Sequence, residues 1–138
     1  MVVLDIGAWE TIIRLIIAAF LGALIGLERE MSHRPAGLRT HMLVSVGSCL
    51  FTLVSIYSFS LDPARVAASI VTGIGFIGAG SIIAGRGHVQ GLTTAASLWV
   101  VAGVGLAAGA GSYFLASVAS IVIFLILQLK RVERRLEK

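Results

Sequence analysis

The feature that most constrains the fold is an uncharged, glycine-rich stretch in the middle of the sequence. It covers residues 67–84, which is 18 residues without a charge, and glycine occupies positions 73, 75, 78 and 80. As a helix it is long enough to cross about 30 Å of hydrocarbon. Each glycine costs about 1 kcal/mol against alanine in water. In lipid, however, the alternative is unpaired backbone amides, so the helix persists and its small residues admit close neighbours. The stretch therefore predicts the central helix of a membrane bundle.

Residues 73–78 also match the dinucleotide-binding pattern G-x-G-x-x-G. That pattern requires a turn between a strand and a helix, with an acidic residue about 20 positions further on. Here the preceding residues are more apolar span, and the following polar segment offers Arg86 and His88 instead of an acid. A nucleotide site is therefore not predicted at this position.

The composition is that of a membrane protein. Hydrophobic residues make up 57% of the chain and charged residues 13%, with a mean hydropathy of +0.98, whereas an ordinary soluble domain has about 25% charged residues. The net charge is +4, but the basic residues cluster outside the apolar runs, which is typical of membrane orientation and not of nucleic-acid binding. We expect residues 1–138 to form a single transmembrane domain.

Five apolar segments have the length of a membrane span. Each contains between 17 and 19 residues, within the range that a spanning helix needs. The expected fold class is an all-α, polytopic transmembrane helix bundle with glycine-rich third and fourth helices. The predicted spans are residues 9–27, 41–59, 66–84, 92–110 and 113–129.

The distribution of Lys and Arg predicts the orientation. With the N-terminus outside and the C-terminus inside, nine of the eleven basic residues lie on the inner side. Arg65 alone lies on the outer side, and Arg14 lies within the first span. The nine inner residues are Arg29, Arg34, Arg39, Arg86, Lys130, Arg131, Arg134, Arg135 and Lys138.

An outer polar cluster is expected from Glu10, Arg14, Asp62 and Arg65. Glu10 and Arg14 are four residues apart and share one helix face, with the acid first. Two interpretations of Arg14 remain open: it snorkels to the surface, or it faces a polar cavity or an acidic partner inside the bundle. In the second case we expect it to pair with Asp62 or Glu10. Asp62 is also expected to cap the third helix, with Pro63 as its first residue.

An inner polar cluster is expected at the opposite face. Charges next to the membrane are either solvated or held on anionic headgroups. Residues 85–91 are predicted to form a flexible loop, and the hydroxyls and free amides after it make the start of the fourth helix an anion-accepting end. Glu28 is a candidate occupant of that end, whereas Thr93 and Thr94 are alternatively ordinary helix caps. The candidates are Glu28, Arg29, Glu30, Arg39, Thr93 and Thr94.

Small residues are expected to mediate helix packing. In the first helix Ala18, Gly22 and Gly26 repeat every four residues, a face suited to the central helix. The third and fourth helices are expected in the interior or against a second subunit, which predicts a homodimer or larger oligomer. The packing glycines of the third helix are Gly73, Gly75, Gly78 and Gly80.

Several segments resemble, in order, the membrane domain of the MgtC/SapB family. They are residues 26–30, 35–41, 62–68, 73–80 and 91–96. The resemblance implies a bacterial-type inner-membrane protein tied to magnesium limitation, acid stress and intracellular survival of pathogens. It also implies a regulator of other membrane machines, including the F-type ATP synthase and transport ATPases. Because MgtC proper carries a soluble C-terminal domain after its last helix, we expect a short, SapB-like member without that domain.

The function expected is that of a regulator and not of an enzyme. No nucleophile has an adjacent base, and His33, His41 and His88 lack metal-ligand spacing, so neither catalysis nor a cofactor is predicted and any metal site stays open. Besides the lipid bilayer, the expected partners are a second copy of the chain and another membrane protein complex. The alternative is a small Mg²⁺ or proton transporter or channel that acts as an oligomer and uses the buried charges.

Overall fold

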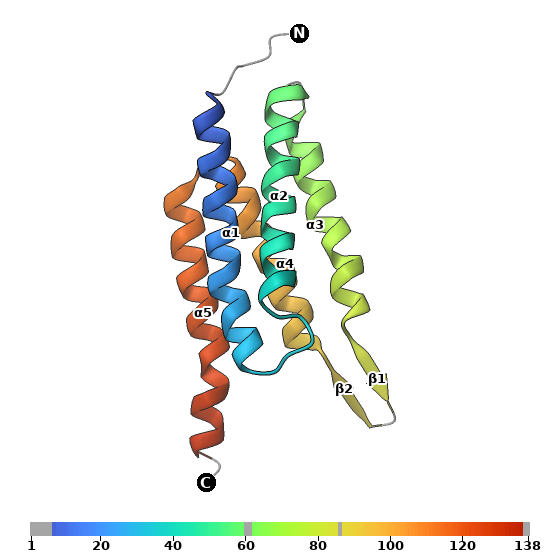
Figure 1. Cartoon of the computed structure of the whole chain (residues 1–138). Coiled ribbons are helices and arrows are strands. Elements are labelled where there is room, and N and C mark those ends of the chain that lie inside the picture. The colour runs from blue at the N-terminus through green and yellow to red at the C-terminus, as the bar shows by residue number, and fades with distance from the viewer. Residues whose placement is uncertain (1–6, 60–61, 86, 137–138) are drawn as a thin grey trace.

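The computed structural model describes residues 7–59, 62–85 and 87–136, with side chains described as far as residue 129. Over these described ranges the chain forms five helices and one short hairpin (Figure 1). The helices are α1 (Ala8–Met31), α2 (Leu38–Ser58), α3 (Pro63–Gly80), α4 (Leu92–Gly109) and α5 (Tyr113–Leu136), and the hairpin strands are β1 (Ile83–Gly85) and β2 (His88–Gln90).

The helices run alternately up and down in one bundle, so α1 begins and α5 ends at opposite ends of it (Figure 1). We call the end where α1 begins the Arg14 end, and the end that carries the hairpin the Arg29 end. The most extensive contacts join α2 to α1 and to α4, while α5 packs against α1 and α4. The core of the bundle is therefore made mainly by α1, α2 and α4, and α5 adds Ala116 and Leu127 to it.

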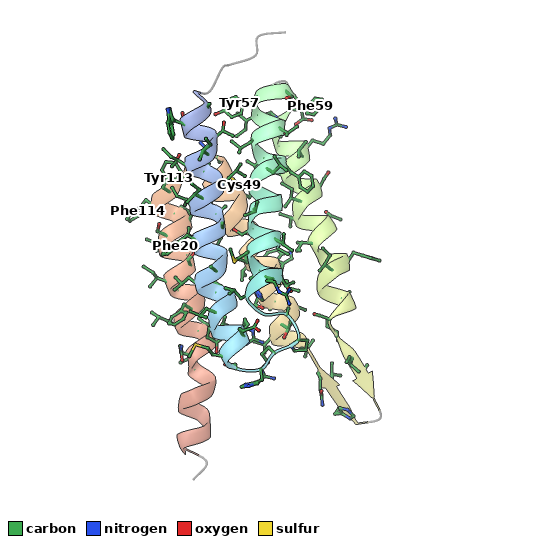
Figure 2. The ribbon with its side chains drawn as sticks, in the orientation of Figure 1. Phe20, Cys49, Tyr57, Phe59, Tyr113 and Phe114 are labelled. Carbon is green, nitrogen blue, oxygen red and sulfur yellow. The ribbon has the colours of Figure 1, made fainter. Side chains whose placement is uncertain are left out.

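The exterior of the bundle is apolar. Four helices, α1 to α4, are long and apolar enough to cross a membrane, and α5 has a shorter apolar part, Tyr113–Leu129. Large apolar side chains are exposed, among them Phe20 (69%) and Phe114 (84%), which project outward on the α1 and α5 side (Figure 2). Buried serines, by contrast, lie between the helices. This inverted distribution suits lipid as the solvent, and the chain is a multi-pass membrane protein.

The segment after α3 differs from the prediction. Helix α3 ends at Gly80 instead of continuing to Ala84, and β1 and β2 pair antiparallel, with Ile83 opposite Gln90. The expectation of a flexible loop over residues 85–91 is therefore wrong. Gly91 has a φ of +90°, and a Cβ at this position would overlap the carbonyl oxygen of Ser81. The end of α3 is thus held tightly against the start of α4, which only glycine permits.

Glycines bring α1 and α4 close to α2. A Cβ on Gly22 would lie 2.8 Å from the carbonyl oxygen of His41, and one on Gly26 would lie 2.8 Å from the Cα of Leu38. On the other side, a Cβ on Gly105 would overlap the carbonyl oxygen of Ser45. The packing role of the α1 glycines is therefore present, but their neighbour is α2 and not the third helix as expected.

Helix α3 lies at the edge of the bundle and is not its central helix. Only Ile74 and Gly78 of α3 are buried. A Cβ on Gly78 would make an ordinary contact with Ala95 at 3.5 to 3.7 Å, whereas a Cβ on any of Gly73, Gly75 and Gly80 would meet nothing within 4 Å. The prediction that α3 is the central helix is therefore wrong within one chain. Its packing against a second subunit stays a prediction.

Candidate functional site

Arg14 points into the bundle at the Arg14 end. Its side chain is 10% exposed, its Nη1 donates a hydrogen bond to the carbonyl oxygen of Gly109 at 2.6 Å, and its Nη2 donates to the carboxylate of Glu10. Tyr57 projects from α2 at this end, and the centroid of its ring lies 6.0 Å from the guanidinium carbon of Arg14 (Figure 2). The last carbonyls of a helix lack intrahelical partners and carry the negative end of its dipole. Arg14 therefore faces the interior and pairs with Glu10, as predicted, and it also binds the end of α4.

Asp62 and Arg65 form a separate pair on α3. The carboxylate of Asp62 accepts a hydrogen bond from the backbone amide of Arg65 at 3.2 Å, and Pro63 is the first helical residue, so the predicted cap is confirmed. The ion pair between Arg65 Nε and Asp62 Oδ2 measures 3.7 Å and is well exposed, so it contributes little. Within the described ranges no hydrogen bond or ion pair joins Arg14 to Asp62, and that predicted pairing is wrong.

Arg29 reaches the first turn of α4 from the end of α1. Arg29 is 3% exposed, and its Nη2 donates to Thr94 Oγ1 at 3.0 Å, while its Nη1 lies 3.6 Å from Oε2 of Glu28. The other oxygen of Glu28 accepts from Ser32 Oγ at 2.7 Å within the last turn of α1. The hypothesis that Glu28 occupies the start of α4 is therefore wrong, because its neighbour Arg29 projects toward α4 instead.

The remaining inner candidates do not form one cluster with Arg29. Oε2 of Glu30 accepts from the amide of Leu38 at 2.9 Å and so satisfies a backbone donor at the start of α2. Arg39 and Thr93 are exposed. The N-cap of α4 is Gly91, with no side-chain cap, so the prediction that Thr93 and Thr94 are ordinary caps is wrong.

A polar stripe along α2 was not predicted. Its members are each at most 6% exposed and follow a spacing of four, three, four and three residues, which places them on one helix face. The signal was present in the sequence as small polar residues at a seven-residue repeat within an apolar span. The stripe consists of His41, Ser45, Ser48, Thr52 and Ser55.

The polar stripe joins α2 to α4. Nε2 of His41 lies 2.9 Å from Ser97 Oγ, and Ser48 Oγ donates to the carbonyl oxygen of Ala102 at 2.6 Å. Ser45 lies between His41 and Ser48 on α2, and there the two helices are in backbone contact, because a Cβ on Gly105 of α4 would overlap the carbonyl oxygen of Ser45. We call this contact the α2–α4 seam. His41 and Ser48 thus bond to α4 and Ser55 Oγ donates to the carbonyl oxygen of Pro63 on α3, while Thr52 bonds within α2 and Ser45 Oγ has no partner among the described residues. Among the described residues, no three His, Cys, Asp or Glu side chains come together as a metal site.

The sequence matches one family and several curated relatives. The model of the MgtC family matches residues 15–136. "Putative magnesium transporter YhiD" of Escherichia coli K12 is 48% identical over 128 residues, covering 86% of this chain and 60% of that protein. Protein MgtC of Salmonella typhimurium LT2 is 48% identical over 112 residues, which cover 81% of this chain and 48% of MgtC. Protein SapB of Bacillus subtilis 168 is 45% identical over 114 residues, which cover 75% of this chain and 49% of SapB.

The chain spans about half to 60% of the length of these relatives. Because SapB is itself covered over only 49% of its length, shortness does not distinguish SapB from MgtC. No solved structure matches the chain. The family match includes the Arg29 end and most of every helix. With this coverage and these identities, the chain belongs to the MgtC family.

Proposed function

We propose that the chain is a regulatory protein of a bacterial-type inner membrane that acts under magnesium limitation by contacting another membrane protein. The relatives support the link to magnesium, because one of them is named a putative magnesium transporter and another is MgtC. The family resemblance supports regulation of membrane machines such as the F-type ATP synthase and transport ATPases, and a connection to acid stress and virulence.

The observation that carries this proposal is the set of uncovered glycines of α3, namely Gly73, Gly75 and Gly80, which we call the glycine surface. Gly73 and Gly80 are seven residues apart and share one face of the helix, and Gly75 lies on another. A Cβ at each of these positions would meet nothing within 4 Å. In lipid, small residues exposed on a helix admit the close backbone approach of a second helix, and this packing is a main source of association. An edge helix that keeps such a surface is suited to binding a transmembrane helix of a partner.

The close packing of the core favours a regulator over an ion transporter or channel. Gly22, Gly26 and Gly105 hold α1, α2 and α4 at backbone contact, which leaves little room for a hydrated ion. The alternative, a small Mg²⁺ or proton transporter, is favoured by the polar stripe and by the name of the relative YhiD, a putative magnesium transporter. Mg²⁺ keeps several waters and prefers carboxylate oxygens, whereas the stripe offers hydroxyls and one imidazole.

The orientation that we propose has the N-terminus outside and the C-terminus in the cytoplasm. Nine of eleven basic residues then lie inside, as the positive-inside rule requires. Reporter fusions after Ser60 and after Lys138 should therefore report the outer and the inner compartment respectively. The same compartment at both positions would contradict the alternating path of the helices.

Gly75→Leu should abolish the function while the bundle stays folded. The side chain would project into open space and block a helix that packs there. The measurement is growth at limiting magnesium of cells that lack the gene and carry wild type or variant at equal membrane levels. Gly103→Leu on α4 is the matched control, because a Cβ there also meets nothing within 4 Å. Full rescue by Gly75→Leu would contradict the proposed contact.

The mass of the purified chain in mild detergent identifies the occupant of this surface. A homodimer that becomes a monomer in Gly75→Leu assigns the glycine surface to a second copy of the chain. An unchanged mass combined with lost growth assigns it to a different membrane protein.

A further inference from the structure

A pocket of about 370 Å³ opens at the Arg29 end, between the end of α1, the loop that follows it, the hairpin and the first turn of α4. It is separate from the α3 glycine surface. Its wall carries two guanidinium groups, those of Arg29 and Arg34, and the uncapped start of α4. The pocket therefore gathers hydrogen-bond donors with positive character at one place.

The start of α4 supplies backbone donors. The first amides of a helix have no intrahelical acceptor and carry the positive end of its dipole. The amide of Ala95 is the first that is bonded within this turn, to the carbonyl oxygen of Gly91 at 2.8 Å. Leu92, Thr93 and Thr94 all line the pocket, and no side chain caps their end of α4.

The two arginines supply an independent observation. Arg29 is only 3% exposed, and the hydrogen bond from its Nη2 fixes it against Thr94. Its Nε is buried and has no hydrogen-bond partner among the described residues, and the same holds for Nε of Arg34. Buried guanidinium donors without acceptors are costly, and both arginines line the pocket, so its wall holds two guanidinium groups whose hydrogen bonding is incomplete.

The charges around the pocket favour an anion. Arg29 and Arg34 contribute two positive charges, and Glu28, which lies beside Arg29, offsets one of them. A tetrahedral oxyanion accepts several such hydrogen bonds at once, because arginine and helix amides are both suited to phosphate. The rim is apolar and exposed, with Ile83 (65%), Val89 (53%) and Leu92 (59%), and could contact the glycerol part of a lipid.

We propose that this pocket binds a phosphate group, presented either by an anionic phospholipid headgroup or by free phosphate. Both sources offer the same oxygens to Arg29, Arg34 and the start of α4. The proposal does not depend on the proposed regulatory function, because it concerns a different surface.

The test uses the full chain in phosphatidylcholine nanodiscs, with two probes. Inorganic phosphate is titrated at constant ionic strength and followed by the thermal shift of the protein, with chloride as the reference anion. Phosphatidylglycerol is added to separate samples, and its retention on the protein is measured by native mass spectrometry. A response to phosphate alone assigns the pocket to the free ion, and retention of the lipid alone assigns it to a headgroup.

Arg34→Gln should weaken binding of the responding probe at least tenfold, whereas Arg39→Gln should change it less than twofold. Both changes remove one positive charge from the Arg29 end, but Arg39 lies in the first turn of α2, is exposed and does not line the pocket. Thr93→Glu keeps the test independent of folding, because an acid in the first turn stabilises a helix while its carboxylate competes for the site. Equal losses in Arg34→Gln and Arg39→Gln, undiminished binding by a folded Thr93→Glu, or no response to either probe would overturn the proposal.

Discussion

Gly105→Ala should lower the free energy of unfolding of the bundle by about 3 kcal/mol, at the upper end of the usual cost of overpacking. The added Cβ would overlap the carbonyl oxygen of Ser45 and would lie 2.8 Å from the carbonyl carbon of Ser45. These are backbone atoms of α2, so no side-chain rotation relieves the clash. The helices must separate, which also disturbs the hydrogen bond of Ser48 to Ala102.

Gly103→Ala provides the matched control for this prediction. It lies two residues away on the same helix, and its Cβ would meet nothing within 4 Å. Because alanine is a better helix former than glycine by about 1 kcal/mol, this variant should be as stable as wild type or more so. The measurement is unfolding in mixed detergent micelles followed by tryptophan fluorescence. Equal stability of the two variants would contradict the close contact between α2 and α4.

Arg14→Leu should insert at least as well as wild type but lower the free energy of unfolding by about 1–3 kcal/mol, the cost of a buried polar group that loses its partner. The orphaned group is the carbonyl oxygen of Gly109, which accepts from Arg14 at 2.6 Å. Glu10 loses its partner too, but its side chain is 48% exposed and can be solvated. Insertion should improve because an arginine in a span costs about 2.5–3.5 kcal/mol.

Arg65→Leu is the control at the same end of the bundle, since its side chain is 81% exposed, and its stability should stay within about 0.5 kcal/mol of wild type. The charge exchange of Arg14→Asp with Asp62→Arg should restore nothing, because these two residues do not pair. Growth at limiting magnesium should be lost in Arg14→Leu and kept in Arg65→Leu. A fully active and more stable Arg14→Leu would mean that the arginine has no structural partner.

Local signals were readable from the sequence, because their partners are sequence neighbours. Asp62 before Pro63 predicted the cap of α3, and Glu10 four residues before Arg14 predicted their ion pair. The second partner of Arg14 could not be predicted in this way. It is a backbone carbonyl 95 residues further along the chain, and a carbonyl oxygen has no signature in the sequence.

The position of α3 could not be predicted from its glycines. A glycine surface is compatible with a packed interface and with an open one, so it does not say which helix is central. Hydroxyl groups are more informative, because inside a membrane they need acceptors. Ser48 finds its acceptor on α4, at the carbonyl oxygen of Ala102, whereas Thr52 bonds back to the carbonyl oxygen of Ser48 within α2, so only the first of these hydroxyls points to a neighbouring helix. The hairpin was missed because its strands are only three residues long.

The measurement that tests the central claim most directly is ion flux through the purified chain in liposomes. Vesicles loaded with a magnesium-sensitive or proton-sensitive dye are compared with protein-free vesicles, and an ionophore added at the end confirms that the dye responds. We expect the same rate with and without the chain, because the α2–α4 seam is closed at Gly105 and Ser45 and the chain acts on a partner. A saturable Mg²⁺ or proton flux that Arg14→Leu abolishes would contradict the regulatory account and establish transport.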